Sequence, residues 1–340
     1  MRRLVAILAL VLTLPAGAHA QDQYAAILLQ YLSGDADAAL AKLARLSYGE
    51  MDAGIEAFDT TRSRQILTGA AAMHTEAALR RGSGAPVDYH LRAATAIVEF
   101  GEPPGAKTNT LRMIRPQFAQ PVPDDFRRLW YCTVINWLEG TARLPLADRY
   151  LAHALAFYPD NPDIHMLAGI AQEMHGSPRV VDSSAGERRR ALTQAAQQYR
   201  AVATAAPDRV EARLRLARVL QQLGKGADAR PLLVPLTAAA DDRVAYLASL
   251  FLGGIEDEEG HAASAETLYD RAAARAPSAQ TARLAASELR HRRGDRQAAA
   301  DVLAASSGEA NTFDPWWTYV FGEYWRTEIL LDAIRQQRRA

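Results

Sequence analysis

The stretch GHAASAETLYDRAAARAP, residues 260–277, carries the pattern that decides the fold of this chain. A glycine opens the stretch, small residues stand around a tyrosine, and a proline closes it. The positions that define the pattern are Gly260, Ala265, Tyr269, Ala272 and Pro277. Glycine tolerates the left-handed backbone that ends one helix, and proline stops the next because it has no N–H to donate. The pattern therefore predicts the second helix of a helix pair.

The same pattern returns along the chain at a nearly constant interval. Gly294 and Ala299 follow Gly260 and Ala265 after about 34 residues. Gly224 precedes Gly260 by nearly the same interval, and one earlier step is longer because it includes the insertion at 177–190. A fixed period of this length is the signature of a solenoid, in which each helix pair buries its apolar face against its neighbours.

This spacing resembles the tetratricopeptide repeat, a helix–turn–helix unit of about 34 residues. The pairs Ala168-Gly169 and Leu216-Ala217 occupy the small positions of the first helix, and the match covers roughly residues 125–307. It departs from the family pattern at Arg213, where a bulky apolar residue is usual. The resemblance implies an all-α fold, a right-handed solenoid of antiparallel helix pairs that holds a partner in its concave groove.

Four segments are expected along the chain. Breakers concentrate in residues 101–107 and 116–123, so a boundary is placed there. The expected segments are a signal peptide at 1–20, a degenerate helical-pair region at 21–120, a repeat array at 121–310 with an insertion at 177–190, and an aromatic-rich C-terminal capping helix at 311–340.

The first twenty residues have the layout of a cleavable secretory signal. Arg2 and Arg3 precede the apolar run LVAILALVLTL, and Ala18-His19-Ala20 has the small-x-small form of a cleavage site. The run is shorter than the roughly 20 residues that span a bilayer. We expect cleavage after Ala20 and a periplasmic location, with secretion to the medium as the second choice.

The charge balance and the cysteine content exclude two features, nucleic-acid binding and an intramolecular disulfide. The chain has 39 basic and 39 acidic residues. Removal of the signal peptide takes away two of the basic residues, Arg2 and Arg3, and none of the acidic ones. A chain without a basic excess is not expected to bind nucleic acid, since that binding needs many phosphates neutralised. Cys132 is the single cysteine, so no intramolecular disulfide is expected. No transmembrane segment is expected in the mature chain.

The register of the repeats predicts which first-helix residues face the groove. They mix charged and apolar side chains, which indicates a peptide or protein partner of unknown identity. The candidates are Asp163, Met166, Ile170 and Glu173 in one unit, Glu211, Arg215, Arg218 and Gln222 in the next, and Leu284, Glu288 and His291 in the last.

Two further segments are candidate binding elements. The insertion SPRVVDSSAGERRR, residues 177–190, is either a solvent loop or a basic flap over the groove that uses Arg179, Arg188, Arg189 and Arg190. The stretch FDPWWTYVFGEYWR is either the cap that seals the solenoid or a docking patch, because aromatic side chains dominate interface hot spots. Its candidate residues are Trp316, Trp317, Tyr319, Tyr324 and Trp325.

No constellation of catalytic residues, metal ligands or cofactor-binding residues stands out. The histidines lack the i, i+4 spacing of a helical zinc site, and no nucleophile elbow is present. The sequence therefore predicts a non-enzymatic interaction scaffold or adaptor of the cell envelope. The alternatives are a hydrolase with a site at a helix-pair junction around His74 and Glu76, and a glycan- or peptidoglycan-binding module.

Overall fold

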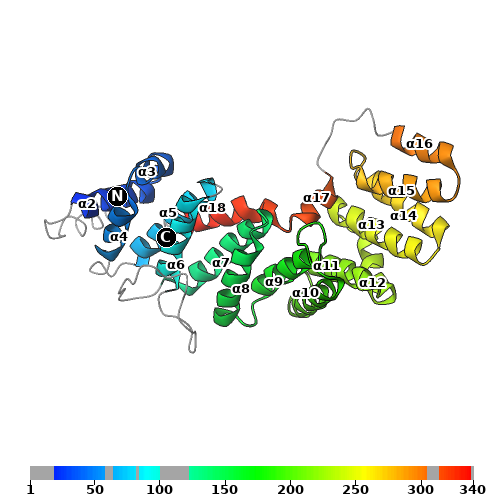
Figure 1. The fold of residues 1–340 in the computed structure, drawn as a ribbon, viewed down its shortest axis with the longest axis horizontal. Helices are drawn as coiled ribbons and strands as arrows, with labels where there is room; N and C mark the ends of the chain where they lie inside the picture. The colour runs from blue at the N-terminus through cyan, green and yellow to red at the C-terminus, as the bar shows by residue number, and fades with distance from the viewer. Residues whose placement is uncertain (1–18, 58–63, 82–83, 100–121, 305–313, 338–340) are drawn as a thin grey trace. The chain divides into compact units, whose positions relative to one another are not determined.

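The computed structural model of the chain is helical throughout its described part, which contains no strand (Figure 1). The described residues are 19–57, 64–81, 84–99, 122–304 and 314–337. The all-α fold predicted from the repeat is confirmed. Most of the predicted signal peptide, residues 1–18, and the predicted boundary after residue 120 lie outside the described residues.

The chain forms two compact units. Unit 1 contains residues 1–137 together with 326–340, and unit 2 contains residues 138–325. The helices whose residues lie mainly in unit 1 are α2 (His19–Leu32), α3 (Ala36–Leu43), α4 (Tyr48–Ala57), α5 (Arg64–Arg81), α6 (Ala85–Val98), α7 (Asp124–Gly140) and α18 (Thr327–Gln337).

Unit 2 is a series of helix pairs followed by a C-terminal segment. The first whole helix of unit 2 is α8 (Leu144–Phe157), and the helix pairs follow it; the second helix of one pair, which contains Pro231, continues as a 3-10 turn. In order, the later elements are α9 (Pro162–His175), α10 (Ala185–Ala205), α11 (Val210–Gln222), α12 (Gly226–Leu233), η2 (Val234–Ala238), α13 (Asp242–Glu258), α14 (Ala262–Arg275), α15 (Thr281–Arg292), α16 (Arg296–Ala304), α17 (Pro315–Val320) and η3 (Tyr324–Arg326).

Small residues in the first helices allow each pair to close tightly. A Cβ added to Gly253 of α13 would lie 2.6 Å from the Tyr269 ring of α14, and a Cβ on Gly169 of α9 would overlap the ring of Tyr199 on α10. Both tyrosines are buried. The small and aromatic positions of the repeat are thus two halves of one contact, which is why they recur together.

The turn glycines have the backbone conformation expected of them. Gly224, Gly260 and Gly294 have positive φ angles of 74°, 83° and 88°. Each follows the C-terminal end of a first helix, where a left-handed residue ends the helix. Because a side chain is strained in this conformation, the sequence signal and the backbone geometry have the same cause.

The insertion is partly helical. Helix α10 begins at Ala185, so the last residues of the 177–190 segment add turns to a helix of 21 residues. Ser184 and Glu187 form a capping box: the Ser184 hydroxyl accepts from the Glu187 N–H, and the Glu187 carboxylate accepts from the Ser184 N–H at 2.8 Å. This reciprocal cap fixes the start of α10.

The C-terminal segment contains two helices. Helix α17 begins after Asp314, ends before Gly322, which has a φ of 68°, and belongs to unit 2. Helix α18 follows η3 and belongs to unit 1. Since Gly322 interrupts the helix, the cap expected over 311–340 is divided between the two units. No helix in the described part of the chain is long and apolar enough to cross a bilayer.

Candidate functional site

The first helices of unit 2 form a surface that we call the groove face, made by α9, α11, α13 and α15. Helix α17 lies along this face. The Tyr319 ring meets Phe251 of α13 at a centroid distance of 5.1 Å, and the Arg215 guanidinium of α11 stands 4.3 Å from the centre of the same ring. A segment of the chain itself therefore occupies part of the predicted partner groove.

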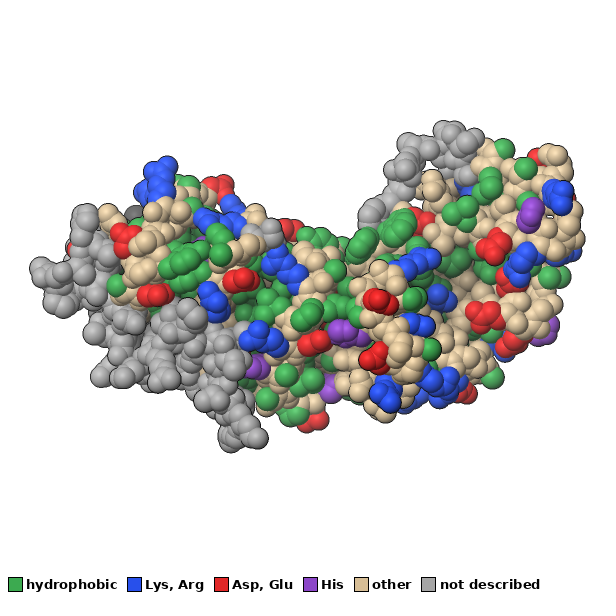
Figure 2. All heavy atoms as spheres, in the orientation of Figure 1, with side chains coloured by type: hydrophobic (Ala, Val, Ile, Leu, Met, Phe, Trp, Pro, Cys, Tyr) green, Lys and Arg blue, Asp and Glu red, His purple; other side chains and the backbone are tan. Residues whose placement is uncertain are grey.

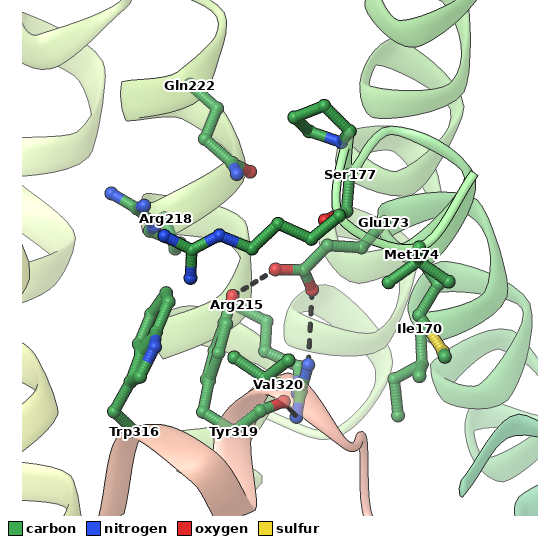
Figure 3. Close-up of a pocket in the computed structure, with 13 residues that line it drawn as sticks. Ile170, Glu173, Met174, Ser177, Arg215, Arg218, Gln222, Trp316, Tyr319 and Val320 are labelled. Atoms are coloured by element: carbon green, nitrogen blue, oxygen red, sulfur yellow. Dashed lines mark hydrogen bonds and ion pairs between the residues drawn. The ribbon is translucent and has the colours of Figure 1, made fainter. Parts of the chain in front are cut away.

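Glu173 of α9 is the centre of the contact with α17 (Figure 3). Its carboxylate accepts hydrogen bonds from the Tyr199 hydroxyl at 2.8 Å, from Arg215 at 3.1 Å, and from the Tyr319 hydroxyl. Burial, reinforced by the charge on Glu173, raises the pKa of both tyrosines well above its ordinary value. Both hydroxyls therefore stay protonated and donate to the carboxylate.

Arg215 joins this carboxylate to the backbone of α17. Its guanidinium donates to the Tyr319 carbonyl oxygen at 3.0 Å and to Glu211 at 2.9 Å. Burial alone lowers the pKa of Arg215, but the carboxylates of Glu211 and Glu173 raise it above its ordinary value. Burial likewise opposes ionisation of Glu211, while Arg215 and Arg243 lower its pKa. Both side chains stay charged because their ion pairs and hydrogen bonds offset the cost of removing the charges from water.

Asp314 fixes the start of α17 and of α15 together. One carboxylate oxygen accepts from the Trp316 N–H at 2.9 Å, as an N-cap does. The other accepts from the Thr281 N–H at 2.8 Å and from its hydroxyl at 2.7 Å. Gln280, the residue at the N-cap of α15, makes no side-chain cap of its own. The cap of α15 is thus supplied from 33 residues away.

The eleven predicted groove residues fall into three environments. Met166, Ile170, Glu173 and Arg215 are buried. Asp163, Glu211 and Arg218 are half-buried, and Asp163 pairs with Arg209 at 2.6 Å. The exposed members are Gln222, Leu284, Glu288 and His291. The α15 section of the groove face is therefore open, whereas the section formed by α9, α11 and α13 is covered.

A pocket of about 270 Å³ remains beside α17. Its walls come from α9, from the loop that follows α9, from α11 and from α17 (Figure 3). Five of the predicted groove residues line it, namely Ile170, Glu173, Arg215, Arg218 and Gln222. The structure thus brings together predicted residues of two successive units, and α17 supplies the remaining wall.

The predicted flap is divided between the pocket edge and a helix. Arg179 is exposed and lines the pocket together with Ser177, Pro178 and Val180. The other three arginines lie on the first turns of α10 and do not line the pocket; they are Arg188, Arg189 and Arg190. Arg188 donates to the carbonyl oxygen of Ser183. Helix formation from Ser184 onward therefore separates Arg179 from the three consecutive arginines.

The aromatic segment has buried side chains on one side and exposed side chains on the other. Tyr319 is buried, and Trp316 is half-buried with its ring stacked 5.6 Å from that of Tyr319. Trp317, Tyr324 and Trp325 are about half exposed, as is Phe321 of the same aromatic stretch. The i, i+4 spacing of Trp317 and Phe321 places their rings 6.3 Å apart on the outer side of α17. The segment thus both packs on unit 2 and presents an exposed aromatic surface.

The alternative site in unit 1 is an interior cluster. His74 and His90 are fully buried, with their Nδ1 atoms 2.9 Å apart, and the Tyr24 hydroxyl lies 2.8 Å from Nε2 of His74. Burial, with His90 nearby, lowers the pKa of His74 well below its ordinary value. Burial, with Arg81 nearby, lowers the pKa of His90 to about 4. Both imidazoles are therefore neutral at pH 7.

Glu76 is bound to other partners. Its carboxylate accepts from the Tyr31 hydroxyl at 2.7 Å, from Arg80 at 2.6 Å and from Arg335 of α18 at 2.7 Å. Its hydrogen bonds thus connect helices, and none joins it to His74. Across the described residues, no three His, Cys, Asp or Glu side chains are grouped so that they could hold a metal ion.

On the face shown in Figure 2, basic and acidic side chains are interspersed over the helix pairs from α10 to α15. Many are paired across neighbouring helices, as Arg230 is with Glu256 at 2.8 Å and Arg290 with Glu266 at 2.8 Å. Such a surface favours no polyanionic partner on this face.

Comparisons with known proteins include one family model and several solved structures. Residues 188–250 match the family model described as tetratricopeptide repeat. A solved structure described as MamA 41-end from Desulfovibrio magneticus RS-1 is similar with 19% identity and a TM-score of 0.43, over 53% of this chain and 92% of that one. A structure described as a functional characterisation of Pseudomonas aeruginosa PilF is similar with 12% identity and a TM-score of 0.43, over 62% of this chain and 88% of that one.

No curated protein sequence matches the chain significantly. The family match covers α11, α12 and η2 entirely and parts of α10 and α13, and it includes Tyr199 and Arg215. The same region shows the phased small and aromatic positions and the left-handed turn glycine. The tetratricopeptide repeat predicted from the sequence is thus confirmed over residues 188–250.

Proposed function

We propose that this protein is a non-catalytic interaction scaffold of the periplasm, and that it binds a peptide or protein segment on the groove face of unit 2. The observation that carries the proposal is the position of α17. Glu173 accepts a hydrogen bond from its tyrosine hydroxyl, Arg215 donates one to its backbone carbonyl oxygen, and Phe251 packs against its tyrosine ring. A face that holds one short aromatic helix in this way has the chemistry for binding a peptide.

The α15 section is the part of this face available to a second chain. Leu284 is 53% exposed, and Glu288 and His291 are exposed beside it. An apolar residue flanked by an acid and an imidazole offers both contact area and hydrogen-bonding groups. We place the partner on this section because α17 already occupies the neighbouring one.

Site-specific photo-crosslinking tests this placement. A photo-reactive amino acid is introduced at Leu284 or Glu288 of the full chain, produced in a Gram-negative host. The matched control is Thr267, an exposed residue of α14, a second helix. We expect a discrete crosslinked partner from the two α15 positions and none from Thr267. Equal capture at all three positions, or capture at none, would contradict binding on the groove face.

The periplasmic location is part of the proposal and has its own test. Its support is the arrangement of Arg2-Arg3, the apolar run and Ala18-His19-Ala20. We expect the protein in the periplasmic fraction, with an N-terminal sequence that begins at Gln21. A cytoplasmic protein that retains Met1 to Ala20 would overturn the location and leave the groove proposal intact.

A further inference from the structure

The pocket beside α17 has one wall whose polar groups are already satisfied. The Glu173 carboxylate accepts three hydrogen bonds, from Tyr199, Arg215 and Tyr319. The guanidinium of Arg215 is divided between Glu173, Glu211 and the Tyr319 carbonyl oxygen. These groups hold α17 in place and offer a ligand little further hydrogen bonding.

Two other guanidinium groups face the pocket without an acidic partner. Within the described residues, neither Arg218 nor Arg179 forms an ion pair. Arg218 donates to the Gln221 side chain at 2.8 Å, but its buried Nε has no hydrogen-bond partner there. Because three arginines and one glutamate line it, the pocket has an excess of positive charge.

Arg218 is held in place by aromatic rings. Its guanidinium carbon lies 5.5 Å from the centre of the Trp316 ring and 5.2 Å from that of Phe251. Cation–π contacts of this kind orient the planar guanidinium and leave its edges free for hydrogen bonds. A guanidinium positioned in this way is suited to a carboxylate, which it can meet with two parallel N–H donors.

The remaining lining is mostly apolar, with Ser177 and Gln222 as its polar members. Ile170 and Met174 come from α9, Val180 from the loop after it, and Trp316 and Val320 from α17. A volume of about 270 Å³ lies just below the roughly 300 Å³ at which small-molecule sites begin. The pocket is therefore sized for a residue or two of a longer chain, with an apolar group next to its anionic group.

We propose that this pocket binds a carboxylate flanked by an apolar side chain, presented by a peptide, with the carboxylate held between Arg218 and Arg179. The inference rests on the proposed function and names the chemistry that the groove face recognises. Because Trp316, Tyr319 and Val320 form one wall, the site is complete only while α17 is docked. The bound peptide and α17 therefore stabilise each other.

Calorimetric titration of the full mature chain with defined peptides tests the inference. The first probe is acetyl-Gly-Ser-Gly-Leu with a free C-terminal carboxylate, compared with its C-terminal amide. The second is acetyl-Gly-Ser-Leu-Glu-Gly-Ser amide, compared with its Gln counterpart. We expect binding in at least one pair, weakened about tenfold or more when the carboxylate is neutralised. The pair that responds shows whether a chain terminus or an acidic side chain is recognised.

Variants of the chain locate the binding. We expect Arg179→Gln and Arg218→Gln each to weaken binding of the responding peptide by about tenfold. Arg189→Gln removes an exposed arginine of α10 outside the pocket and should leave binding unchanged. Arg179 is itself exposed, so its variant is not expected to unfold. Trp316→Ala should weaken binding and also abolish the rise in melting temperature caused by the peptide.

Several outcomes would overturn the inference. Binding that does not depend on the carboxylate, equal effects of the Arg179 and Arg189 variants, or no binding by any of the four peptides would each do so. The crosslinking experiment separates this failure from failure of the proposed function. If Leu284 and Glu288 capture a partner while the peptides do not bind, the groove function stands and the pocket assignment falls.

Discussion

Helices α17 and α18 come from the same C-terminal segment, yet they are held in different ways. Each is tied to a buried glutamate of its own unit, α17 to Glu173 and α18 to Glu76. Tyr319 of α17 is buried and shares Glu173 with Tyr199 and Arg215. Arg335 of α18 is 24% exposed, and Glu76 has Tyr31 and Arg80 as further partners.

The two contacts differ in how many buried charges lose their partners when one side chain is removed. In unit 2, removing one member leaves other buried charges without partners, which is costly. In unit 1, removing Arg335 leaves Glu76 with two partners, and a partly exposed ion pair contributes little. We infer that α17 is an integral part of unit 2, whereas α18 depends on its apolar contacts, including buried Leu331 and Ile334.

The largest effect is expected from Arg215→Ala. The change leaves buried Glu173 and half-buried Glu211 with fewer partners and removes the hydrogen bond to the Tyr319 carbonyl oxygen. We expect unit 2 to lose about 3–5 kcal/mol of unfolding free energy, measured by urea unfolding of the full chain. Arg189→Ala, an exposed change of the same type, is the control and should alter stability little. A small loss at Arg215 would remove the contrast between the two helices.

Glu139 is the next test, because this buried glutamate of α7 stands one repeat period before Glu173 and has no hydrogen-bond partner among the described residues. Burial first, and then the charge on Glu323, raise its pKa well above the ordinary 4.5. Below pH 4.5 it is protonated in both the folded and unfolded states. As the pH rises, the unfolded state ionises first, so the folded state loses stability relative to it.

Glu139→Gln should therefore stabilise the protein by about 1–3 kcal/mol at pH 7.5, and the gain should disappear as the pH falls to 4.5 and below. Urea unfolding at several pH values measures this. The matched control is Glu76→Gln, whose carboxylate has three partners and whose neutralisation should destabilise unit 1 at pH 7.5. A Glu139→Gln variant that is less stable at pH 7.5 would show that the carboxylate has a partner in solution.

A moderate effect is expected from Asp314→Ala, which removes the cap shared by α17 and α15. The loss of unfolding free energy should be about 1–2 kcal/mol, in the upper range for an N-cap, since two helix starts lose their acceptor. Hydrogen exchange of the Trp316 and Thr281 amides is the specific measurement, and both should exchange faster. Faster exchange at Trp316 alone would mean that α15 does not depend on this cap.

The smallest effect is expected from Arg335→Gln. Its ion pair with Glu76 is partly exposed, so we expect a loss of about 0.2–1 kcal/mol, reduced further by added salt. Thermal unfolding at low and high salt measures it. A loss as large as that of Arg215→Ala would show that α18 is held in the same way as α17.

Contacts that repeat locally are predictable from the sequence. Gly253 and Tyr269 belong to the two helices of one pair, so their contact recurs with the period and is visible in the spacing. The turn glycines are visible for the same reason. The Ser184–Glu187 capping box is also present in the sequence as Ser-x-x-Glu before an apolar run, and it marks the start of α10.

The contacts of α17 could not be predicted in this way. Tyr319 and Glu173 are separated by 146 residues, and no periodic signal links a single aromatic segment to positions so distant. The register selects the groove residues, but it does not show that α17 covers one section of the groove and leaves α15 open. In unit 1, His74 and His90 lie on two different helices, and no spacing in the sequence relates a position on α5 to a position on α6.

The docked α17 has a consequence for any competing peptide. A segment joined to its own binding face has an effective concentration that is typically in the millimolar range. A free peptide present at micromolar concentration, with the same intrinsic affinity, would therefore occupy the α17 section in only about one molecule in a thousand. Screens with free peptides should accordingly report only the surfaces that α17 leaves uncovered, the α15 section and the arginine-lined pocket.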